Sequence, residues 1–375
     1  MIESGPVDGL TAARLTSQCH EWSRTEPLIQ VPILNSISQS LQRPRFAGRQ
    51  HFFQATTGIA NSQNTKTVGQ VIAMLSPTLT CELGQPLGML GYFAALNHPQ
   101  PITELLHQAV EWLRSQGASK IVGPINGDTW HAYRINNGPY DSPPFLMEPG
   151  NPPWYETLWT AAGFEVLDQY HSKVVSDVAA AAAATRDALT TAKSHGYRFR
   201  QLDPARFDCE LKTIYQISCR SFRDNFLYDE IAESEFLDLY RPSKAIADPR
   251  LVLFAEDSDH NPVGFLFNVI DYQRAVHAMA GANHWPAKLR FLLNRKHADA
   301  VNFKSIGVAP EHRRNSIAGA LMHLGYHAAI ELGYRKANLC LIHDGNASSK
   351  LDGGLGTILR RYSLYQFANE SLKIQ

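Results

Sequence analysis

The sequence predicts an α/β protein built from two related domains. A strand, a helix, a glycine and a second strand follow one another at residues 87–125 and again at 302–344. Strands also alternate with helices along most of the chain, which is typical of α/β architecture. The length of 375 residues exceeds the usual extent of one domain, about 100–200 residues. These three observations together favour two domains over one.

Up to residue 125, the first half holds four predicted strands and one helix. Residues 51–55, 68–77, 87–96 and 120–125 are rich in Phe, Val, Ile and Leu and are predicted strands. Between the last two, apolar residues recur at helical spacing, after Pro101 and before a capping Gly117. They are Ile102, Leu105, Leu106, Ala109, Val110 and Leu113. The Pro-, Gly- and Asn-rich residues 125–159 are expected to be irregular, and 163–175 to form a closing pair of strands.

The two halves meet near residues 176–196, which contain six consecutive alanines. A flexible linker and a helix are both compatible with this run, but alanine is the best helix former. We therefore favour a helical connector that opens the second domain.

The second half repeats the order of the first. Strands are predicted at 198–202, 302–310, 335–344 and 358–367, and a hairpin at 250–272 with its turn at 259–261. Helices are predicted at 206–222, 231–246 and 316–333, where the last ends at Gly333 as the first-half helix ends at Gly117.

Composition limits the classes of function. The 35 Lys and Arg balance the 35 Asp and Glu, so we expect no broad basic surface and no nucleic-acid partner. The five cysteines form no C-x-x-C pair, so neither a zinc site nor a redox motif is expected, and scattered thiols suit a reducing cytoplasm. No secretory signal or membrane-spanning run is visible. We expect a soluble cytoplasmic protein without a metal or a membrane partner.

One basic turn stands out, because two arginines precede a helix. Arg313 and Arg314 are followed by Asn315 and Ser316, and Ile317 is the one bulky residue among the next few. Cations are unfavourable at a helix N-terminus, whereas an anion is stabilised there. This turn either holds a phosphate or is a solvated helix start, and the residues alone leave both open.

The run from Val308 to Leu321 resembles motif A of the GNAT acyltransferase superfamily, V-x-P-x-x-[RQ]-x-x-G-x-[GA]-x-x-L. Val308, Pro310, Arg313, Ala318 and Leu321 match, and Ser316 stands in place of the usual Gly. The resemblance implies two tandem GNAT-like domains, each a mixed, mostly antiparallel sheet flanked by helices. Domain 1–176 would be a degenerate copy, and domain 177–375 would bind acetyl-CoA or another acyl-CoA.

The resemblance also implies which residues bind the donor. Backbone N–H groups of the turn would bind the coenzyme A pyrophosphate, and the preceding strand would pair with the pantetheine arm. The implied residues are Ile306, Gly307, Val308, Arg313, Arg314, Asn315, Ser316, Ile317, Ala318, Gly319 and Asn346. In the first half, "NHPQPITELL" has no arginine and contains Pro101, which lacks a backbone donor.

Catalysis is less clearly marked. Asn346 matches an N-x-x-A motif with Ser349 in place of Ala, but the tyrosine that acts as acid seven positions later in many members is here Gly353. Candidates for this role are His343, Tyr362 and Tyr365, each of which can equally be an ordinary structural residue. Asp271 and His284 are weak candidates for the base. No Ser-His-Asp or Cys-His arrangement is legible, which favours direct attack over covalent catalysis.

The sequence therefore predicts an acyl-CoA-dependent N-acyltransferase, with N-acetylation as the expected reaction. Its acceptor can be a small amine, an amino acid or a protein amine, and residues 220–230 lie where family members line the acceptor pocket. Residues 277–300 either roof the thioester or pack as helices with solvated charge. Two alternatives are a non-catalytic acyl-CoA-binding protein and an aminoacyl-tRNA-dependent transferase, and zero net charge argues against the second.

Overall fold

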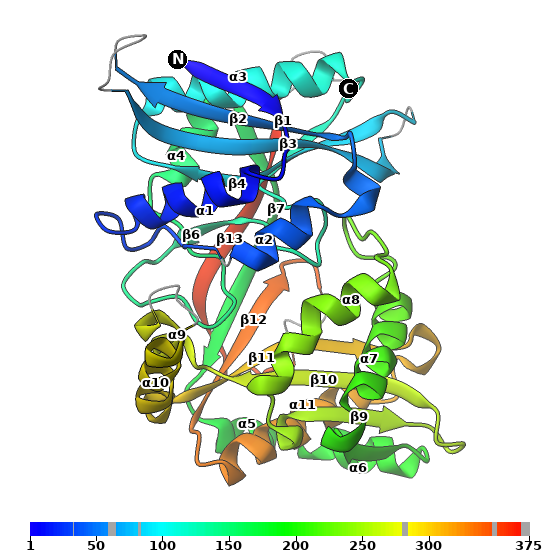
Figure 1. Cartoon of the computed structure of the whole chain (residues 1–375). Coiled ribbons are helices and arrows are strands. Elements are labelled where there is room, and N and C mark those ends of the chain that lie inside the picture. Colours follow the sequence, from blue (N-terminus) through cyan, green and yellow to red (C-terminus); the bar gives the residue numbers. More distant parts are fainter. Residues whose placement is uncertain (33, 59–64, 82–83, 280–283, 347–350, 369–375) are drawn as a thin grey trace. The chain divides into compact units, whose positions relative to one another are not determined.

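The computed structural model describes residues 1–32, 34–58, 65–81, 84–279, 284–346 and 351–368 (Figure 1). The chain forms two compact units, each with a mixed, mostly antiparallel sheet flanked by helices. The N-terminal unit comprises Met1–Ser142, Pro149–Gln169 and Tyr362–Gln375. The C-terminal unit comprises Pro143–Glu148 and Tyr170–Arg361.

This division differs from the contiguous boundary at 176/177 that the sequence predicts. Two long strands, β7 (Phe164–Val175) and β13 (Thr357–Phe367), contribute residues to both units. The short segment 143–148 also packs with the C-terminal unit, although its neighbours in the chain belong to the other unit. Each unit is thus completed by residues that are distant in sequence, which local patterns do not reveal.

The sheet of the N-terminal unit has the strand order β1-β2-β3-β4-β5-β13. Neighbours are antiparallel except for β4 and β5, which are parallel. The strands besides β13 are β1 (Ile2–Pro6), β2 (Gln50–Thr57), β3 (Lys66–Thr80), β4 (Pro86–Ala95) and β5 (Ile121–Gly123). The helices are α1 (Thr11–Trp22), α2 (Leu34–Leu41), α3 (Pro99–Ser115) and α4 (Tyr155–Ala161).

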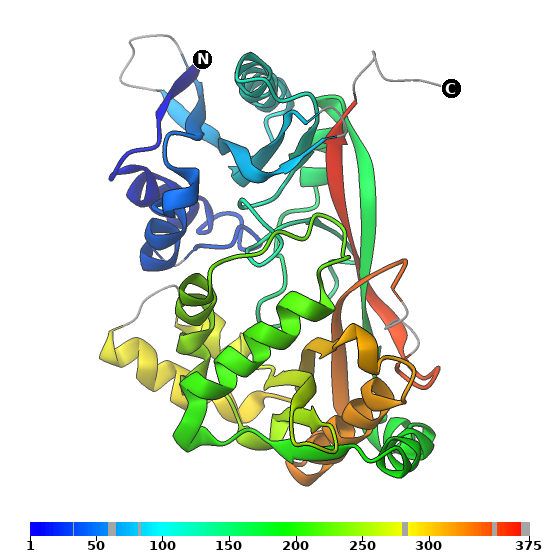
Figure 2. The same ribbon diagram turned by 90° about the vertical axis from the view of Figure 1, so that its right-hand side faces the viewer.

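Helix α3 connects the two parallel strands and covers one face of this sheet. Figure 2 shows it in cyan, end-on beside the strands. Its six predicted apolar positions are all buried in the core, which confirms the helical pattern. Gly117, just after the helix, has φ +90°, a left-handed conformation that glycine adopts without a steric cost.

The sheet of the C-terminal unit has the order β7-β12-β11-β10-β9-β8, and only β11 and β12 are parallel. Its other strands are β8 (Arg198–Gln201), β9 (Val252–Glu256), β10 (Pro262–Ile270), β11 (Ala300–Val308) and β12 (Lys336–His343). The helices are α5 (Val178–Ala184), α6 (Arg186–Ser194), α7 (Phe207–Ser221), α8 (Glu233–Tyr240), α9 (Gln273–Ala278), α10 (Trp285–Asn294) and α11 (Ile317–Glu331).

Helices cover both faces of this second sheet, as the alternation along β10 shows. Leu266 lies under α11, where a Cβ on Gly325 would come within 2.7 Å of its side chain. Phe267, one residue on, packs on the other face against Tyr240 of α8, with ring centroids 6.5 Å apart. Successive strand residues point to opposite faces, so α11 and α8 enclose the sheet from two sides.

The repeated unit in the sequence is confirmed by the topology. In each unit one helix, α3 or α11, joins two parallel strands, β4 and β5 or β11 and β12, and parallel neighbours need such a crossover. Gly333 follows α11 with φ +85° and so matches Gly117. The alanine-rich join is helical, as predicted, and Asp177 caps α5 by accepting hydrogen bonds from the N–H groups of Ala179 and Ala180.

Two predictions of local structure were wrong. Residues 125–159 are not wholly irregular, because they contain β6 (Ile135–Gly138) and α4. The strand β6 pairs with β13, a partner at the far end of the sequence, so its polar residues gave no local signal. Residues 163–175 form the single strand β7 rather than a pair, since no turn interrupts them.

Candidate functional site

The edge of β11 that faces β12 is only partly paired. Backbone pairing between the two parallel strands runs from Ala300–Lys336 to Phe303–Leu339. On its other edge, β11 stays paired with β10 as far as Val308. Within the described chain, residues 305–308 therefore present one unpaired strand edge. Such an edge offers N–H and C=O groups to an extended ligand, which can add to the sheet as a strand would.

Both strands depart from regular geometry where they part. In β11, Phe303 faces Asn268 and Ser305 faces Phe267, so Lys304 is an extra residue in a β-bulge. In β12 the register against β7 shifts after Leu339, and Leu341 has φ +56°. The Leu341 N–H donates to the Ser172 hydroxyl at 2.9 Å, so its hydrogen bond goes to the β7 side.

The turn after β11 contains two left-handed residues that are not glycine. Arg314 has φ +69° and Ser316 has φ +61°. Ser316 stands where the motif that this turn resembles has Gly, and its conformation explains that preference, because glycine alone reaches this region without strain. The backbone geometry of the motif is therefore kept despite the different side chain.

Helix α11 begins directly after this turn without a side-chain cap. Ser316 is the N-cap residue, yet its hydroxyl accepts no hydrogen bond from the first turn. The leading N–H groups of a helix have no intrahelical partner and carry partial positive charge. Those of Ile317, Ala318 and Gly319 are thus suited to an anion, in line with the sequence prediction.

The two arginines of the turn have different surroundings. The Arg313 guanidinium donates from Nη2 to the Ser221 carbonyl at 2.7 Å and from Nε to the Val308 carbonyl at 3.4 Å. Arg314 is exposed and makes no hydrogen bond or ion pair with the described residues. Arg314 is therefore the arginine whose guanidinium is available to a ligand.

A second set of contacts fixes the shape of the turn. Asn315 donates from Nδ2 to the Tyr197 hydroxyl at 3.1 Å and to the His312 carbonyl at 3.2 Å. The Tyr197 hydroxyl also lies 3.0 Å from His312 Nδ1, and Glu311 forms an ion pair with Arg220. The Asn315 side chain thus holds the turn together.

At two of the predicted donor-binding positions, Gly307 and Gly319, neighbouring protein atoms leave no room for a side chain. A Cβ on Gly319 would lie 2.7 Å from the Cβ of Ala188 in α6, so this glycine lets two helices approach. A Cβ on Gly307 would lie 2.6 Å from the Phe265 ring and 3.3 Å from the Ser221 hydroxyl. The buried Ser221 Oγ has no hydrogen-bond partner in the described chain, and its place beside β11 was not predictable from local sequence patterns.

The predicted residues His343 and Asn346 lie at the C-terminal end of β12 and just after it. His343 is the last residue of β12, and its Nδ1 accepts a hydrogen bond from the Gly345 N–H at 3.2 Å. Its ring packs edge-on against Tyr170, with centroids 5.1 Å apart. The Asn346 N–H donates to the His343 carbonyl at 2.9 Å. Ser349 lies outside the described residues.

The position of the missing tyrosine has no room for one. Gly353 has φ +64°, and a Cβ there would lie 2.9 Å from the Cβ of Ala184 in α5. The absence of tyrosine is therefore built into this loop. His171 was not among the predicted residues, and its Nδ1 lies 2.5 Å from a carboxylate oxygen of Asp344, the residue after His343.

Tyr362 and Tyr365 are both fully buried in β13, within its N-terminal-unit portion. Tyr365 belongs to the hydrophobic core of that unit and accepts a hydrogen bond from Asn137 Nδ2 at 3.0 Å. Burial raises the pKa of Tyr365 to about 12. The predicted role of these tyrosines as acids stays a prediction.

The two weak candidates for the base occupy different settings. Asp271 follows β10, and burial raises the pKa of its carboxyl although it accepts hydrogen bonds from the N–H groups of Leu146 and Gln273. His284 is exposed and caps α10, because its Nδ1 accepts a hydrogen bond from the Ala287 N–H at 3.3 Å.

The segment 143–148 is fixed beside the bulge of β11. Glu148 and Arg360 form a buried ion pair, with Oε1 and Nε 3.0 Å apart and side chains 0% and 2% exposed. Lys304 Nζ lies 5.4 Å from the centre of the Phe145 ring and donates to the Met147 carbonyl at 3.5 Å. This apolar segment contacts the residue at which β11 and β12 part, and sequence reasoning missed it because the segment belongs to the irregular region.

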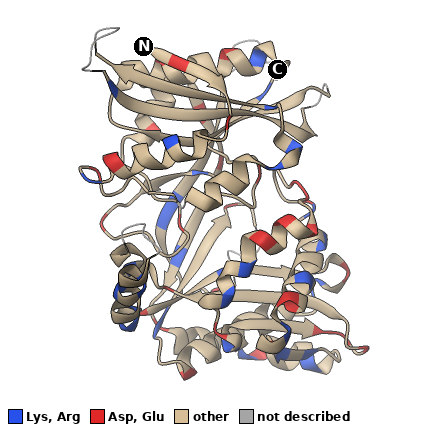
Figure 3. Cartoon of the chain, in the orientation of Figure 1, with Lys and Arg blue, Asp and Glu red and all other residues tan. Residues whose placement is uncertain are grey.

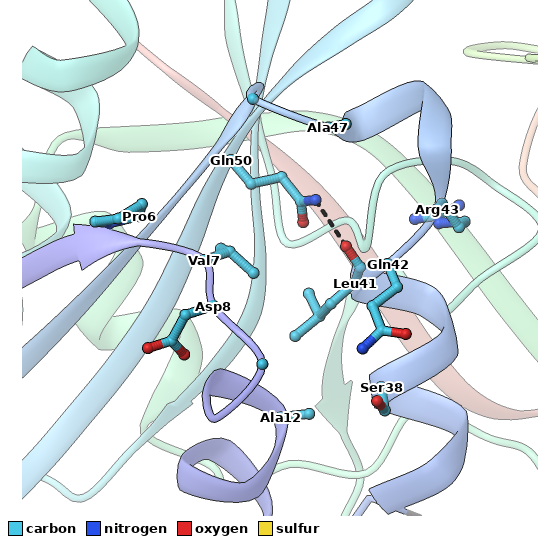
Figure 4. A pocket seen from close by; sticks show the side chains of 12 residues that line it. Pro6, Val7, Asp8, Ala12, Ser38, Leu41, Gln42, Arg43, Ala47 and Gln50 are labelled. Atoms are coloured by element: carbon cyan, nitrogen blue, oxygen red, sulfur yellow. Dashed lines mark hydrogen bonds between the residues drawn. The ribbon is translucent and has the colours of Figure 1, made fainter.

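The N-terminal unit contains a cavity of its own (Figure 4). Its volume is about 390 Å³, and its lining comes from the β1–α1 loop, α2 and the start of β2. Gln50 in its wall donates from Nε2 to the Leu41 carbonyl at 2.9 Å. None of the predicted donor-binding residues lines this cavity.

Comparison with known proteins adds a family and several relatives. Residues 211–351 match the profile of the acetyltransferase (GNAT) family. A bacterial ceramide synthase of Caulobacter vibrioides (strain NA1000 / CB15N) is 26% identical over 332 residues, which cover 84% of this chain and 83% of that protein. Protein YghO of Escherichia coli (strain K12) is 24% identical over 257 residues, 67% of this chain and 64% of that protein, so this chain spans less than two thirds of it.

Two solved structures share the fold. A GCN5-related glucosamine N-acetyltransferase region in a fungal multi-domain β-N-acetylglucosaminidase superposes with a TM-score of 0.52 and 15% identity, covering 98% of this chain and 38% of that one. A tandem GNAT protein from the clavulanic acid biosynthesis pathway has a TM-score of 0.50 and 12% identity, covering 98% of each chain. At such identities the likeness concerns the fold alone.

Proposed function

Residues 211–351 form an acetyltransferase domain of the GNAT family, and on this premise we propose that the chain is an acyl-CoA-dependent N-acyltransferase. One observation carries the proposal. The unpaired edge of β11 leads directly into a left-handed turn and the uncapped N-terminus of α11. An extended arm with amide groups and a terminal pyrophosphate, as in coenzyme A, fits this succession of strand edge and anion site.

Each part of this arrangement supplies one contact to the donor. The N–H and C=O groups of Ile306 and Val308 are suited to the pantetheine amides. The N–H groups at the start of α11 are suited to the pyrophosphate, and Arg314 adds a positive charge with five donors. Arg313 and Asn315 serve this site indirectly, since their side chains hold the turn in place.

The transfer itself is a direct attack of the acceptor amine on the thioester carbonyl. A free N–H group of the β11 edge near Gly307 polarises that carbonyl and stabilises the negative charge that develops on its oxygen. Covalent catalysis by the buried thiols is disfavoured, because burial raises the pKa of Cys19 and of Cys340 to about 12.

Proton transfer falls to His343 in this proposal. A neutral imidazole whose Nδ1 accepts a hydrogen bond, as that of His343 does from Gly345, carries its proton on Nε2. Once the ring has also taken up the proton that the attacking amine loses, the resulting imidazolium can give its Nε2 proton to the departing thiolate and return to the neutral state. His343 thereby takes the place of the tyrosine for which Gly353 leaves no room.

The acceptor class follows from the relative named a ceramide synthase. A ceramide is an amide between a fatty acyl group and the amine of a long-chain amino alcohol. A long-chain amine is therefore our first candidate for the acceptor, and a long-chain acyl-CoA for the donor. Acetyl-CoA with a small amine is the second candidate.

One specific feature favours a non-catalytic alternative. The position of the usual acid is occupied by Gly353, whose left-handed φ and contact with Ala184 exclude a larger side chain. A protein that binds acyl-CoA without transferring the acyl group would show this feature too.

Binding and turnover distinguish these functions. Thermal shift measurements with acetyl-CoA, palmitoyl-CoA and free coenzyme A test the donor site, and thiol release with small amines and long-chain amino alcohols tests the transfer. We expect stabilisation by coenzyme A compounds and release with one acceptor class. Absence of any stabilisation overturns the donor site, whereas stabilisation without release from any acceptor supports the non-catalytic alternative.

A further inference from the structure

Helices α9 and α10, with the 3-10 turn Arg295–His297, expose an unusual amount of apolar surface. Five large apolar side chains of this α9–α10 surface are at least 38% exposed, namely Val276, Trp285, Leu289, Leu292 and Leu293. Trp285 is 75% exposed and Leu293 61%. No other stretch of equal length among the described residues holds more than two such side chains. Large exposed apolar patches mark a contact surface.

The apolar residues of α10 form a stripe on its solvent side. Trp285, Leu289 and Leu292, together with Leu293, follow the spacing i, i+4, i+7 and i+8, which is one face of a helix. The opposite face already packs on the protein, since Ala287 is buried and the Phe291 ring lies 5.5 Å from that of Tyr272. The helix therefore has a second apolar face that the described fold does not use.

The segment that carries this stripe is rich in basic side chains and has no acidic one. Residues 273–298 contain no Asp or Glu, although the whole chain has 35 acidic and 35 basic residues. Five exposed basic residues share the segment, namely Arg274, Lys288, Arg290, Arg295 and Lys296. Arg274 lies on α9, and the other four lie on α10 and the turn that follows it, where Figure 3 shows blue positions. The surface thus combines exposed apolar groups with a uniform positive charge.

We propose that the α9–α10 surface binds the face of an anionic phospholipid bilayer. A helix with an apolar stripe between lysines and arginines lies in the interface of such a membrane, with its apolar side chains in the acyl region. Tryptophan favours the headgroup level, and each basic residue near an anionic leaflet is attracted to it. An acidic protein partner would match the charge but not the outward-facing tryptophan and leucines.

The α9–α10 surface directly precedes β11 in the chain, which suggests how a lipid acceptor would reach the transfer site. The turn Arg295–His297 ends shortly before Ala300, where β11 begins, and the anion-binding turn follows the other end of β11. A lipid acceptor would thus be met at the end of β11 away from the pyrophosphate turn. The binding itself does not depend on acyl transfer.

This inference departs from the expectation that the protein meets no membrane. Among the described helices, none is long and apolar enough to cross a bilayer. The attachment is therefore peripheral, through side chains of α9 and α10, which a search for long apolar runs does not detect.

Vesicle sedimentation tests the proposal with the full-length protein. We expect binding to phosphatidylglycerol vesicles that weakens as salt rises, and little binding to phosphatidylcholine. The double variant Lys288→Gln/Arg290→Gln should bind about 25-fold more weakly, at about fivefold per charge. Leu292→Ser/Leu293→Ser should lose at least about tenfold. The matched controls Leu34→Ser and Arg24→Gln/Lys66→Gln, at exposed positions of the N-terminal unit, should bind as the wild type does.

Fluorescence separates insertion from attraction by charge alone. Trp285 is the one exposed residue among the six tryptophans, all of which are described. Lipids brominated on their acyl chains should quench the protein, and Trp285→Phe should abolish this quenching while vesicle binding remains. Binding without quenching overturns insertion.

Two other results overturn the proposal altogether. One is that all variants bind vesicles equally. The other is a dimer in light scattering that Leu292→Ser dissociates, with no vesicle binding, because the stripe would then be an interface between two copies.

Discussion

Arg313 donates a hydrogen bond of 2.7 Å to the carbonyl of Ser221, the last residue of α7. An arginine at this position satisfies a terminal carbonyl and lies at the negative end of the helix dipole. Arg314, the next residue, has no such contact with the described chain. The two arginines of the turn therefore divide two tasks, one within the protein and one toward the donor.

Arg314→Ala should weaken coenzyme A binding by about 10- to 100-fold, the worth of one charge-assisted hydrogen bond. Its thermal midpoint without ligand should stay that of the wild type, since the side chain contacts no described residue. Isothermal titration with free coenzyme A measures the affinity.

Arg313→Ala is the matched control and should lower the midpoint without ligand, because it leaves the Ser221 carbonyl without its partner. If Arg314→Ala binds coenzyme A as tightly as the wild type does, the pyrophosphate lies elsewhere.

Ser316→Gly should stabilise the protein by about 0.5–1 kcal/mol, because glycine adopts φ +61° without the strain of a serine. The larger conformational entropy of glycine in the unfolded chain offsets part of this gain. Ser316→Val should destabilise it, since a branched side chain is strained in this region. Urea unfolding measures both. Equal stability of the Gly and Val variants would contradict the strain that the backbone angle indicates.

Arg360→Met should destabilise the protein by about 3–5 kcal/mol, because it leaves the Glu148 carboxylate buried without its partner. The double variant Glu148→Gln/Arg360→Met should cost less than the two single changes together, since no charge remains buried. A double-mutant cycle in urea measures this coupling.

The exposed pair of Arg241 and Asp238 provides the comparison, and its removal should cost no more than about 0.5 kcal/mol. A coupling between Glu148 and Arg360 as small as that would refute the structural role given to their ion pair.

Asp128→Asn should lower stability more at neutral pH than in acid. Burial alone would raise the pKa of Asp128, but the hydrogen bond and charge of His131 and the charges of Arg43 and Arg45 outweigh it, so the pKa lies below its ordinary value. A carboxylate with a lowered pKa stabilises the fold above the unfolded-state pKa of about 3.9, and loses this effect as pH falls below it.

Urea unfolding at about pH 7 and about pH 3 measures the free energy of unfolding of the wild type and of Asp128→Asn. The difference between the two proteins should be several kcal/mol at about pH 7 and smaller at about pH 3. Asp141→Asn, at an exposed position, should change neither. A deficit of Asp128→Asn that is equal at both pH values would show that its charge does not matter.

Local patterns predicted the elements that carry their own signal. The apolar spacing of α3 and the paired glycines at 117 and 333 sufficed to find the repeated unit. The basic turn was recognisable because two arginines precede a helix, where positive charge is unfavourable.

Elements defined by distant partners were not predictable in this way. The strand β6 depends on β13, and the segment 143–148 depends on Arg360 and Lys304. The different tasks of Arg313 and Arg314 depend on a carbonyl at the end of α7. Gly319 was predicted to bind the donor, and the structure adds a second constraint on it, the close approach of Ala188 of α6. In each case the deciding contact joins residues that are far apart in the chain.

The pairing of Tyr365 with Gly123 makes β13 a strand of the N-terminal unit's sheet, although it is synthesised long after β5. On the ribosome, this sheet therefore waits for its last strand while the 219 residues between Ser142 and Tyr362 are made. At roughly 5–20 residues per second, that interval is roughly 10–40 s. During this time the edge of β5 is open to other chains, so the protein's yield in cells should depend on the chaperones that occupy nascent strand edges.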